Sequence, residues 1–246
     1  MNRADIFDSA CLSDTGRVRS HNEDAALARP DLGLWVVADG MGGHAAGDFA
    51  SATIVEAAAS VGLASSLDDL EARFLERLSR AHGDVRVRAD ELGATVGATV
   101  VALLTHGPDF ACAWAGDSRL YRLRDGILEQ LSRDHTEVEA LLSQGTISRA
   151  EAAAWPRRNV ITRAVGVGDQ ITCEMVRGNL QPGDVFLLCS DGLTEHVSDR
   201  GIAFHLKDAP DAETMCRVLV EDTLARGATD NVTCVAIRVQ AMAMAE

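Results

Sequence analysis

The sequence predicts an α+β fold for this chain of 246 residues. Segments with strand character come in blocks, and helical segments stand as neighbours between these blocks instead of alternating with single strands. Short turns separate several successive strands, which favours antiparallel pairing. Because we find no internal repeat, low-complexity tract or proline-rich linker, we expect one domain over residues 1–246.

The first 91 residues combine two apolar strands with two helices. The expected elements are strands at 7–14 and 32–39, and helices at about 45–61 and 67–91. Each strand ends in a turn-forming aspartate. The second helix is indicated by Leu70, Phe74 and Leu78, which recur at helical spacing.

The rest of the chain is rich in strands, with one polar helical interruption. We expect strands at 95–106, 109–117, 119–126, 127–132, 171–177, 185–192 and 231–239, and a helix at about 211–226. The region 135–158 differs, because its short helical pieces are polar. We interpret residues of about 137–158 as a flap-like insertion over one face.

Composition excludes several classes of protein. The net charge is −14, from 37 acidic and 23 basic residues, which argues against a general nucleic-acid binder. It is compatible with a cation site, although solubility alone would also explain it. No apolar run approaches the roughly 20 residues of a membrane span, and the first residues lack a signal-peptide core. We therefore expect a cytoplasmic protein.

The six cysteines form no C-x-x-C pair. This pattern disfavours a zinc ribbon or a thioredoxin-type site. Most of them lie in apolar runs, which indicates buried free thiols in a reducing compartment.

The most informative residues are aspartates at strand ends, each beside a glycine or an asparagine. They are Asp24, Asp39, Asp117, Asp191 and Asp230, with Glu23 and Glu195 close by. Any single one could be a turn or helix-cap residue. Five are harder to explain in that way, because distant strand ends can converge on one rim.

Carboxylates, backbone carbonyls and water suit Mg²⁺ or Mn²⁺. Zinc is disfavoured, because the seven histidines include no H-x-x-x-H pair. Two hard cations about 3.5–4 Å apart can drive hydrolysis without a protein nucleophile. Arg19, five residues before Asp24, is the candidate to grip a phosphate; a solvated surface arginine is the alternative interpretation.

A glycine-rich stretch allows a second interpretation, a dinucleotide-binding fold. Gly40, Gly42 and Ala45 fit G-x-G-x-x-A, as in a dinucleotide fold. Asp39 directly before it would repel a pyrophosphate, and no second strand ending in an acid follows. We expect instead that the glycines let the backbone approach a metal, with the Gly40 carbonyl as a ligand. The sequence contains no Walker-type P-loop.

Read together, the motifs are similar to those of the PPM (PP2C-type) metal-dependent protein serine/threonine phosphatases, in particular the compact bacterial members. They occur in family order and are GRVRSHNEDA, VVADGMGGHAAGDFAS, TVGATVVAL, AWAGDSRLYRLRDG, LSRDHT, NVITRAVG, LQPGDVFLLCSDGLTEHV and ATDNVTCVAIRV. The resemblance covers about residues 11–239. It implies a central β-sandwich of two antiparallel sheets flanked by pairs of α-helices. It also implies hydrolysis of phosphoserine and phosphothreonine by a water activated by two Mg²⁺ or Mn²⁺ ions.

The resemblance also assigns roles by position. Asp39 resembles the carboxylate that bridges the two ions, and Arg19 the arginine that binds phosphate. The resemblance also implies that the Gly40 carbonyl, Asp191 and Asp230 bind the ions directly. Glu23 and Asp24 would hold waters that are bound to the ions. A weaker third-metal site is implied at Asp117 and Asp191, with Glu195 as its additional acidic residue.

The sequence departs from the family pattern in two places. Met41 stands where many members have a histidine that is proposed as the general acid. His44 could substitute for it, or support the site from behind the ligands, or be a structural residue. Ala98 stands where threonine is frequent, and we expect little effect. We expect His135 to be structural.

For partners, the resemblance implies phosphorylated proteins, a Ser/Thr kinase and its substrates, with no nucleic acid and no membrane, and a monomer. Control of a secretion system is one role for such a protein. Two alternatives stay open: a phosphatase-like regulatory domain with poor turnover, and another two-metal hydrolase such as a nuclease.

Overall fold

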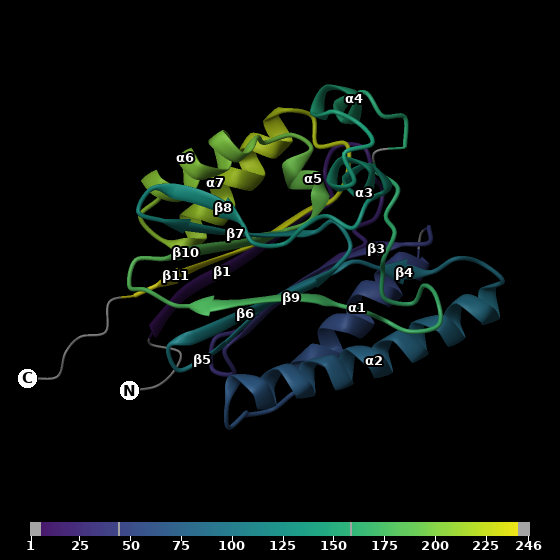
Figure 1. Cartoon of the computed structure of the whole chain (residues 1–246), viewed down its shortest axis with the longest axis horizontal. Helices are drawn as coiled ribbons and strands as arrows, with labels where there is room; N and C mark the ends of the chain where they lie inside the picture. The colour runs from purple at the N-terminus through teal and green to yellow at the C-terminus, as the bar shows by residue number, and fades with distance from the viewer. Residues whose placement is uncertain (1–5, 44, 158, 241–246) are drawn as a thin grey trace, which may run out of the picture.

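The computed structural model describes residues 6–43, 45–157 and 159–240, and it forms a sandwich of two antiparallel sheets (Figure 1). The first sheet has the order β1 (Phe7–Asp14), β11 (Val232–Val239), β10 (Val185–Cys189), β7 (Arg119–Arg124), β8 (Ile127–Gln130). The second has the order β2 (Asp24–Arg29), β3 (Leu34–Met41), β5 (Val100–His106), β6 (Asp109–Ala115), β9 (Glu174–Asn179), with the short β4 (Gly97–Ala98) paired to β3. This confirms the predicted α+β sandwich.

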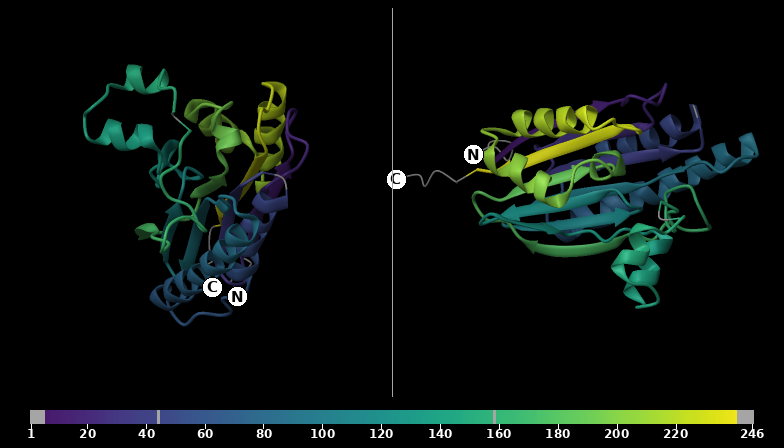
Figure 2. Two further views of the ribbon diagram at one scale, coloured as in Figure 1. Left: turned by 90° about the vertical axis from the view of Figure 1, so that its right-hand side faces the viewer. Right: turned by 90° about the horizontal axis from the view of Figure 1, so that it is seen from above.

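Helices cover the outer face of each sheet (Figure 2). Helices α1 (Ala45–Ala59) and α2 (Leu67–Leu92) pack on the second sheet, and α6 (Asp199–Asp208) and α7 (Ala212–Ala225) pack on the first. The ends of α2 follow local rules. Its Ser66 side chain accepts a hydrogen bond from the Asp69 amide, and Gly93 ends it with a left-handed φ of 58°.

The core has three layers because central strands bury both of their faces. On β3, Trp35 and Val37 point between the sheets, while Val36 and Ala38 point toward α1 and α2. The rings of Phe110 and Phe186 meet edge-to-face between the sheets, with centroids 5.1 Å apart. This packing fixes the sheets relative to each other, and with them the strand ends that form the site.

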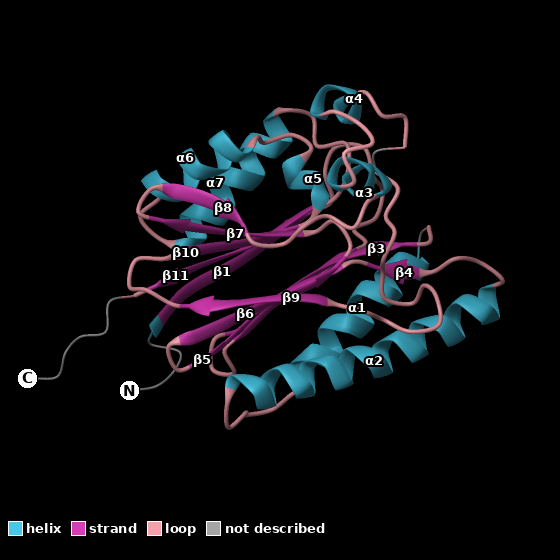
Figure 3. Cartoon of the chain, in the orientation of Figure 1, coloured by secondary structure: helices cyan, strands magenta, loops and turns pink. Residues whose placement is uncertain are grey.

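Two short helices lie at one end of the sandwich, away from both helix pairs (Figures 2 and 3). They are α3 (Glu137–Ser143) and α4 (Arg149–Ala153), capped by Thr136 and by a Ser148 capping box. We call residues 137–157 the flap; residue 158 of the expected insertion lies outside the described residues.

Sequence analysis missed three elements. Strand β2 is alanine-rich and half-buried along its length, so it shows no alternation. Helix α6 and the four-residue α5 (Asp191–Thr194) follow the acidic SDG motif, which we interpreted only as a strand end. Strand β9 begins at Glu174 rather than at residue 171.

Two expected strand features also needed correction. The expected strand 95–106 divides into β4 and β5 at Thr99, whose backbone and side chain both bond to Asp39. Successive β6 and β7 do not pair, because the chain crosses from one sheet to the other between them.

Candidate active site

Strand ends from both sheets meet beside the flap and form an acidic cleft of about 260 Å³. Asp39 lies near the end of β3, opposite Asp24 of β2, with which it is in register. Asp117 follows β6, Asp191 opens α5 directly after β10, and Asp230 precedes β11. The predicted residues that line this cleft are Arg19, Glu23, Asp39, Gly40, Asp117, Asp191 and Asp230. Glu195 lines an adjoining cavity of about 290 Å³, which also reaches Asp117 and Asp191.

The carboxylates repel one another in a partly dry environment. Burial, followed by the charges of Asp24 and Asp191, raises the pKa of Asp39 well above its usual range. Burial and the neighbouring Asp117 raise the pKa of Asp191 to about 8. Burial is also the main cause that raises the pKa values of Asp24 and Asp117 to about 6. Such a cluster is stabilised by cations that offset the negative charge.

The donor set suits hard cations, although the carboxylates do not form a compact cage. Among the described residues, no three His, Cys, Asp or Glu side chains are grouped as a ready metal site. Some carboxylate oxygens are already engaged by other side chains. Arg19 donates to Asp230 at 2.6 Å, and Ser190 Oγ donates to Asp24 Oδ2 at 2.8 Å. The other oxygen of Asp24 is buried without a partner. This arrangement fits Mg²⁺ or Mn²⁺ ions that keep several water ligands.

Backbone contacts hold Asp39 and Gly40 in place. The Asp39 amide donates to Thr99 Oγ1 at 3.2 Å, the Thr99 amide donates to the Asp39 carbonyl at 2.8 Å, and Thr99 Oγ1 shares a 2.6 Å hydrogen bond with Ser118. The Gly40 amide donates to the Glu23 carbonyl at 3.1 Å. A Cβ at Gly40 would lie 2.3 Å from the Gly47 carbonyl oxygen, so only glycine fits.

Asn231 and Ser190 are scaffold residues that sequence analysis did not assign. The Asn231 side chain accepts from the Glu23 amide at 2.8 Å and donates to the carbonyls of Thr15 and His21 at 2.9 Å. Ser190 Oγ accepts from the Thr233 amide while it donates to Asp24. In the sequence, the only indication of a role for Asn231 was its position next to Asp230 in ATDN.

The structure supports a structural role for His135. Its Nδ1 accepts from the Gly116 amide at 3.2 Å, and its ring stacks on Trp114 with centroids 6.0 Å apart. Burial is the main cause that lowers its pKa, so the ring is neutral at pH 7. His44 lies outside the described residues, and Met41 lines the cleft.

Comparisons with known proteins agree with this architecture. Residues 16–227 match the protein phosphatase 2C family, so the chain belongs to that family. It is 38% identical over 235 residues to the serine/threonine protein phosphatase PstP of Mycobacterium tuberculosis, covering 92% of this chain but 44% of that protein. It is 32% identical over 230 residues to the serine/threonine phosphatase stp of Listeria monocytogenes, covering 90% and 91% of the two chains.

Solved structures show the same fold. PppA, a regulatory component of the T6SS in Pseudomonas aeruginosa, superposes with a TM-score of 0.87 at 45% identity, over 94% of this chain and 97% of that one. The catalytic domain of PstP in complex with two manganese ions superposes with a TM-score of 0.82 at 35% identity, over 96% and 99%. That relative thus holds ions of the class expected here from the carboxylates, while no comparison addresses a third ion.

Proposed function

We propose that this protein is a metal-dependent phosphatase that hydrolyses phosphoserine and phosphothreonine in proteins. One observation carries the proposal: carboxylates from five distant parts of the sequence line one cleft together with an arginine. Burial and mutual repulsion raise the pKa values of Asp39 and Asp191, which supports cation binding at this cluster. The family and the manganese-bound relative support the same reaction.

The ligand roles inferred from sequence are part of this proposal. Asp39, the Gly40 carbonyl, Asp191 and Asp230 would hold two Mg²⁺ or Mn²⁺ ions. Glu23 in the cleft, and Asp24 beside Asp39, would orient their waters. Bound there, the two ions would supply an activated water and neutralise phosphate charge. Asp117 with Asp191, and Glu195 behind them, would form a third, weaker site.

The chain's own residues orient the phosphate ester. Arg19 lines the cleft, where its planar fork can donate hydrogen bonds to phosphate oxygens, and its bond to Asp230 sets its direction. Met41 supplies no proton donor at the position where many family members have histidine. We infer that the proton for the leaving alcohol comes from water.

The proposal extends to the domain, the flap, the partners and the location of the protein. We infer one phosphatase domain over residues 1–246, with the flap controlling access to the cleft, because Asn159 and Ile161 at its end line the cleft. Phosphorylated proteins would be the substrates, and a Ser/Thr kinase the opposing enzyme. The likeness to PppA supports a role in secretion-system control. We also propose a cytoplasmic monomer that binds neither nucleic acid nor membrane. No helix in the described part of the chain has the length and apolarity to cross a bilayer.

Turnover of p-nitrophenyl phosphate with Mn²⁺, and its loss on addition of EDTA, tests the proposed activity. We expect activity with Mn²⁺, full inhibition by EDTA, and recovery when Mn²⁺ is returned, because the carboxylates alone cannot activate water. A phosphothreonine peptide compared with DNA separates a protein phosphatase from a nuclease. No turnover at saturating Mn²⁺ would favour the regulatory alternative, and turnover that persists in EDTA would exclude a metal-dependent reaction.

We expect Arg19→Ala to raise KM for a phosphopeptide by about tenfold or more, because a hydrogen bond to a charged group contributes roughly 1.5–3 kcal/mol. The measurement is KM and kcat over a range of peptide concentrations at saturating Mn²⁺. Arg17→Ala is the matched control, since the described contact of Arg17 is made by its backbone amide, to the Ala228 carbonyl. An Arg19→Ala enzyme with the KM of the wild type would remove Arg19 from the phosphate site.

A further inference from the structure

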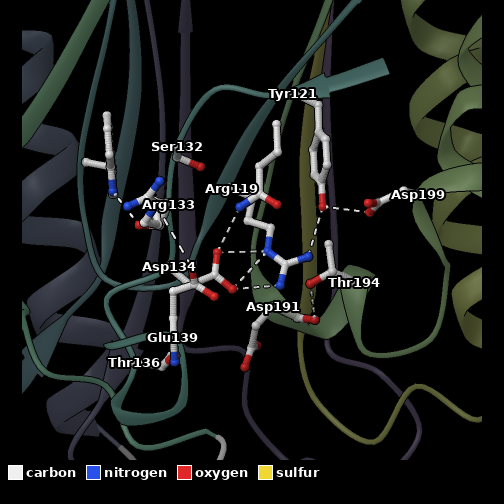
Figure 4. Close-up of polar contacts among 12 residues, drawn as sticks. Arg119, Tyr121, Ser132, Arg133, Asp134, Thr136, Glu139, Asp191, Thr194 and Asp199 are labelled. Atoms are coloured by element: carbon white, nitrogen blue, oxygen red, sulfur yellow. Dashed lines mark hydrogen bonds and ion pairs between the residues drawn. The ribbon is translucent and has the colours of Figure 1, made fainter. Parts of the chain in front are cut away.

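A bidentate ion pair joins the start of β7 to the segment that leads into the flap (Figure 4). Arg119 lies two residues after Asp117. Its Nε donates to both oxygens of Asp134, at 2.9 and 3.1 Å, and its Nη2 donates to Oδ2 at 2.6 Å. Its Nη1 donates to the Tyr121 hydroxyl at 2.9 Å, which in turn donates to Asp199. The guanidinium is therefore held from two sides and has one orientation.

This ion pair is better shielded from water than a typical surface pair. The side chains of Arg119 and Asp134 are 27% and 17% exposed, whereas the flap's own pair, Arg157 with Glu137, is 64% and 31% exposed. Partly buried, forked pairs are screened less by salt and are geometrically more specific than exposed ones. We therefore expect the Arg119–Asp134 contact to persist in solution.

Neighbouring contacts fasten the same two segments together. Trp114 Nε1 donates to the Arg133 carbonyl at 2.7 Å. The Gly116 amide donates to His135 Nδ1, and the His135 amide donates back to the Gly116 carbonyl at 2.9 Å. The stretch 114–119, which carries Asp117, is thus held against residues 133–136.

Those residues form the root of the flap. Thr136 caps α3, and the returning arm of the flap pairs with the outgoing one: the Glu137 amide donates to the Val160 carbonyl at 2.9 Å, and the Thr162 amide donates to the His135 carbonyl at 2.7 Å. On the returning arm, Asn159 reaches the cleft and donates to Glu195 at 2.7 Å. A continuous set of bonds therefore leads from Arg119 to Asn159, which follows the flap and borders the cleft.

We infer that the Arg119–Asp134 pair is a clamp that positions the flap for protein substrates, with Arg119 as a positioning residue. The inference rests on the proposed phosphatase function. The clamp fixes the flap root, and through it Asn159 and Ile161, at the edge of the cleft. A phosphoprotein is large enough to contact the flap, whereas p-nitrophenyl phosphate occupies little beyond the phosphate position. Loosening the clamp should therefore raise KM more for a phosphoprotein than for p-nitrophenyl phosphate.

Arg119→Lys and Asp134→Asn test the clamp with little change in volume. Lysine keeps the charge but lacks the fork, and asparagine keeps the shape but lacks the charge. We expect trypsin to cut after Arg149, in the flap, about tenfold faster, because cleavage follows the population of the locally opened state. We also expect KM for a phosphothreonine protein to rise about fivefold or more, with a smaller change for p-nitrophenyl phosphate.

A second ion pair on the same strand provides the matched control. Arg124, at the other end of β7, donates to both oxygens of the buried Asp184 at 2.6 Å. Arg124→Lys and Asp184→Asn should lower the melting temperature without changing the cleavage rate after Arg149 or the KM for the phosphoprotein. Melting curves of all four variants separate global from local loosening.

The clamp hypothesis is wrong if Arg119→Lys and Asp134→Asn match the wild type in flap cleavage and KM, or if the control pair produces the same changes. Flap cleavage is measured without substrate. A wild-type protein that lacks turnover would therefore contradict the proposed function, while the cleavage rates still decide the inference about the flap.

Discussion

Asp39→Asn should lower kcat for p-nitrophenyl phosphate and for a phosphothreonine peptide by about 10³-fold, because loss of a carboxylate that is proposed to hold the ions removes several kcal/mol of transition-state stabilisation. Asp39 lines the cleft, and its pKa shift reflects burial and the charges of four other aspartates. Asparagine keeps the shape and one oxygen but carries no charge. Steady-state kinetics at saturating Mn²⁺ measures the effect.

The fold of Asp39→Asn should stay intact, because Asp39 is held by backbone bonds to Thr99 that asparagine retains. The metal-free variant should melt at a higher temperature than the metal-free wild type, since a repelled, partly buried charge is gone. Asp31→Asn, in the turn after β2, is the control and should turn over normally. Near wild-type turnover by Asp39→Asn would refute the assignment of Asp39.

The sequence was informative where one local pattern determined one feature. Leu70, Phe74 and Leu78 at helical spacing predicted α2, and all three are buried against the second sheet. The acids that follow apolar runs predicted the cleft, because a strand that ends in Asp39 or precedes Asp191 carries the signal within a few residues. Repulsion between these acids then made the cation class predictable.

Features that depend on distant residues were not predictable. Thr99 bonds to Asp39 across 60 positions, and Asn231 bonds to Glu23 across 208. Neither a threonine between two strands nor an asparagine before one has a local pattern that signals such a role. Strand β2 was missed for a related reason: its pairing with β3 is determined by register, while its alanines have weak strand propensity. The Arg119–Asp134 pair likewise depends on the pairing of β7 with β8, which brings Arg119 beside a residue 15 positions further along the chain.

A second large effect is expected at Asp191, at the other side of the cleft. Asp191→Asn should lower kcat by about 10²–10³-fold, because the residue is proposed to ligate an ion directly. Its position at the start of α5 is set by the backbone: the Glu195 amide donates to the Asp191 carbonyl at 2.8 Å. Asparagine keeps this backbone bond, so the variant should lose only the negative charge of the side chain. When kcat is measured at several Mn²⁺ concentrations, the kcat of the variant should stay below that of the wild type even at saturating Mn²⁺.

The same variant should change how the stability of the metal-free protein depends on pH. Burial and neighbouring carboxylates raise the pKa of Asp191 to about 8 from 3.8, so between these values the folded state holds a proton that the unfolded state has lost. The free energy of unfolding of the wild type should therefore fall as pH rises from about 4 to 8, at up to about 1.4 kcal/mol per pH unit for this group. Asp191→Asn lacks the group and should show a shallower decline.

Urea unfolding in EDTA at a series of pH values measures this slope for both proteins. Saturating Mn²⁺ should reverse the loss in the wild type at pH 8, because an ion that binds only the folded, deprotonated cluster stabilises it. Equal slopes for the wild type and Asp191→Asn would show that Asp191 is not part of a mutually repelling cluster. The proposed metal site would then lose its main support, since each of its carboxylates is expected to destabilise the others until a cation is bound.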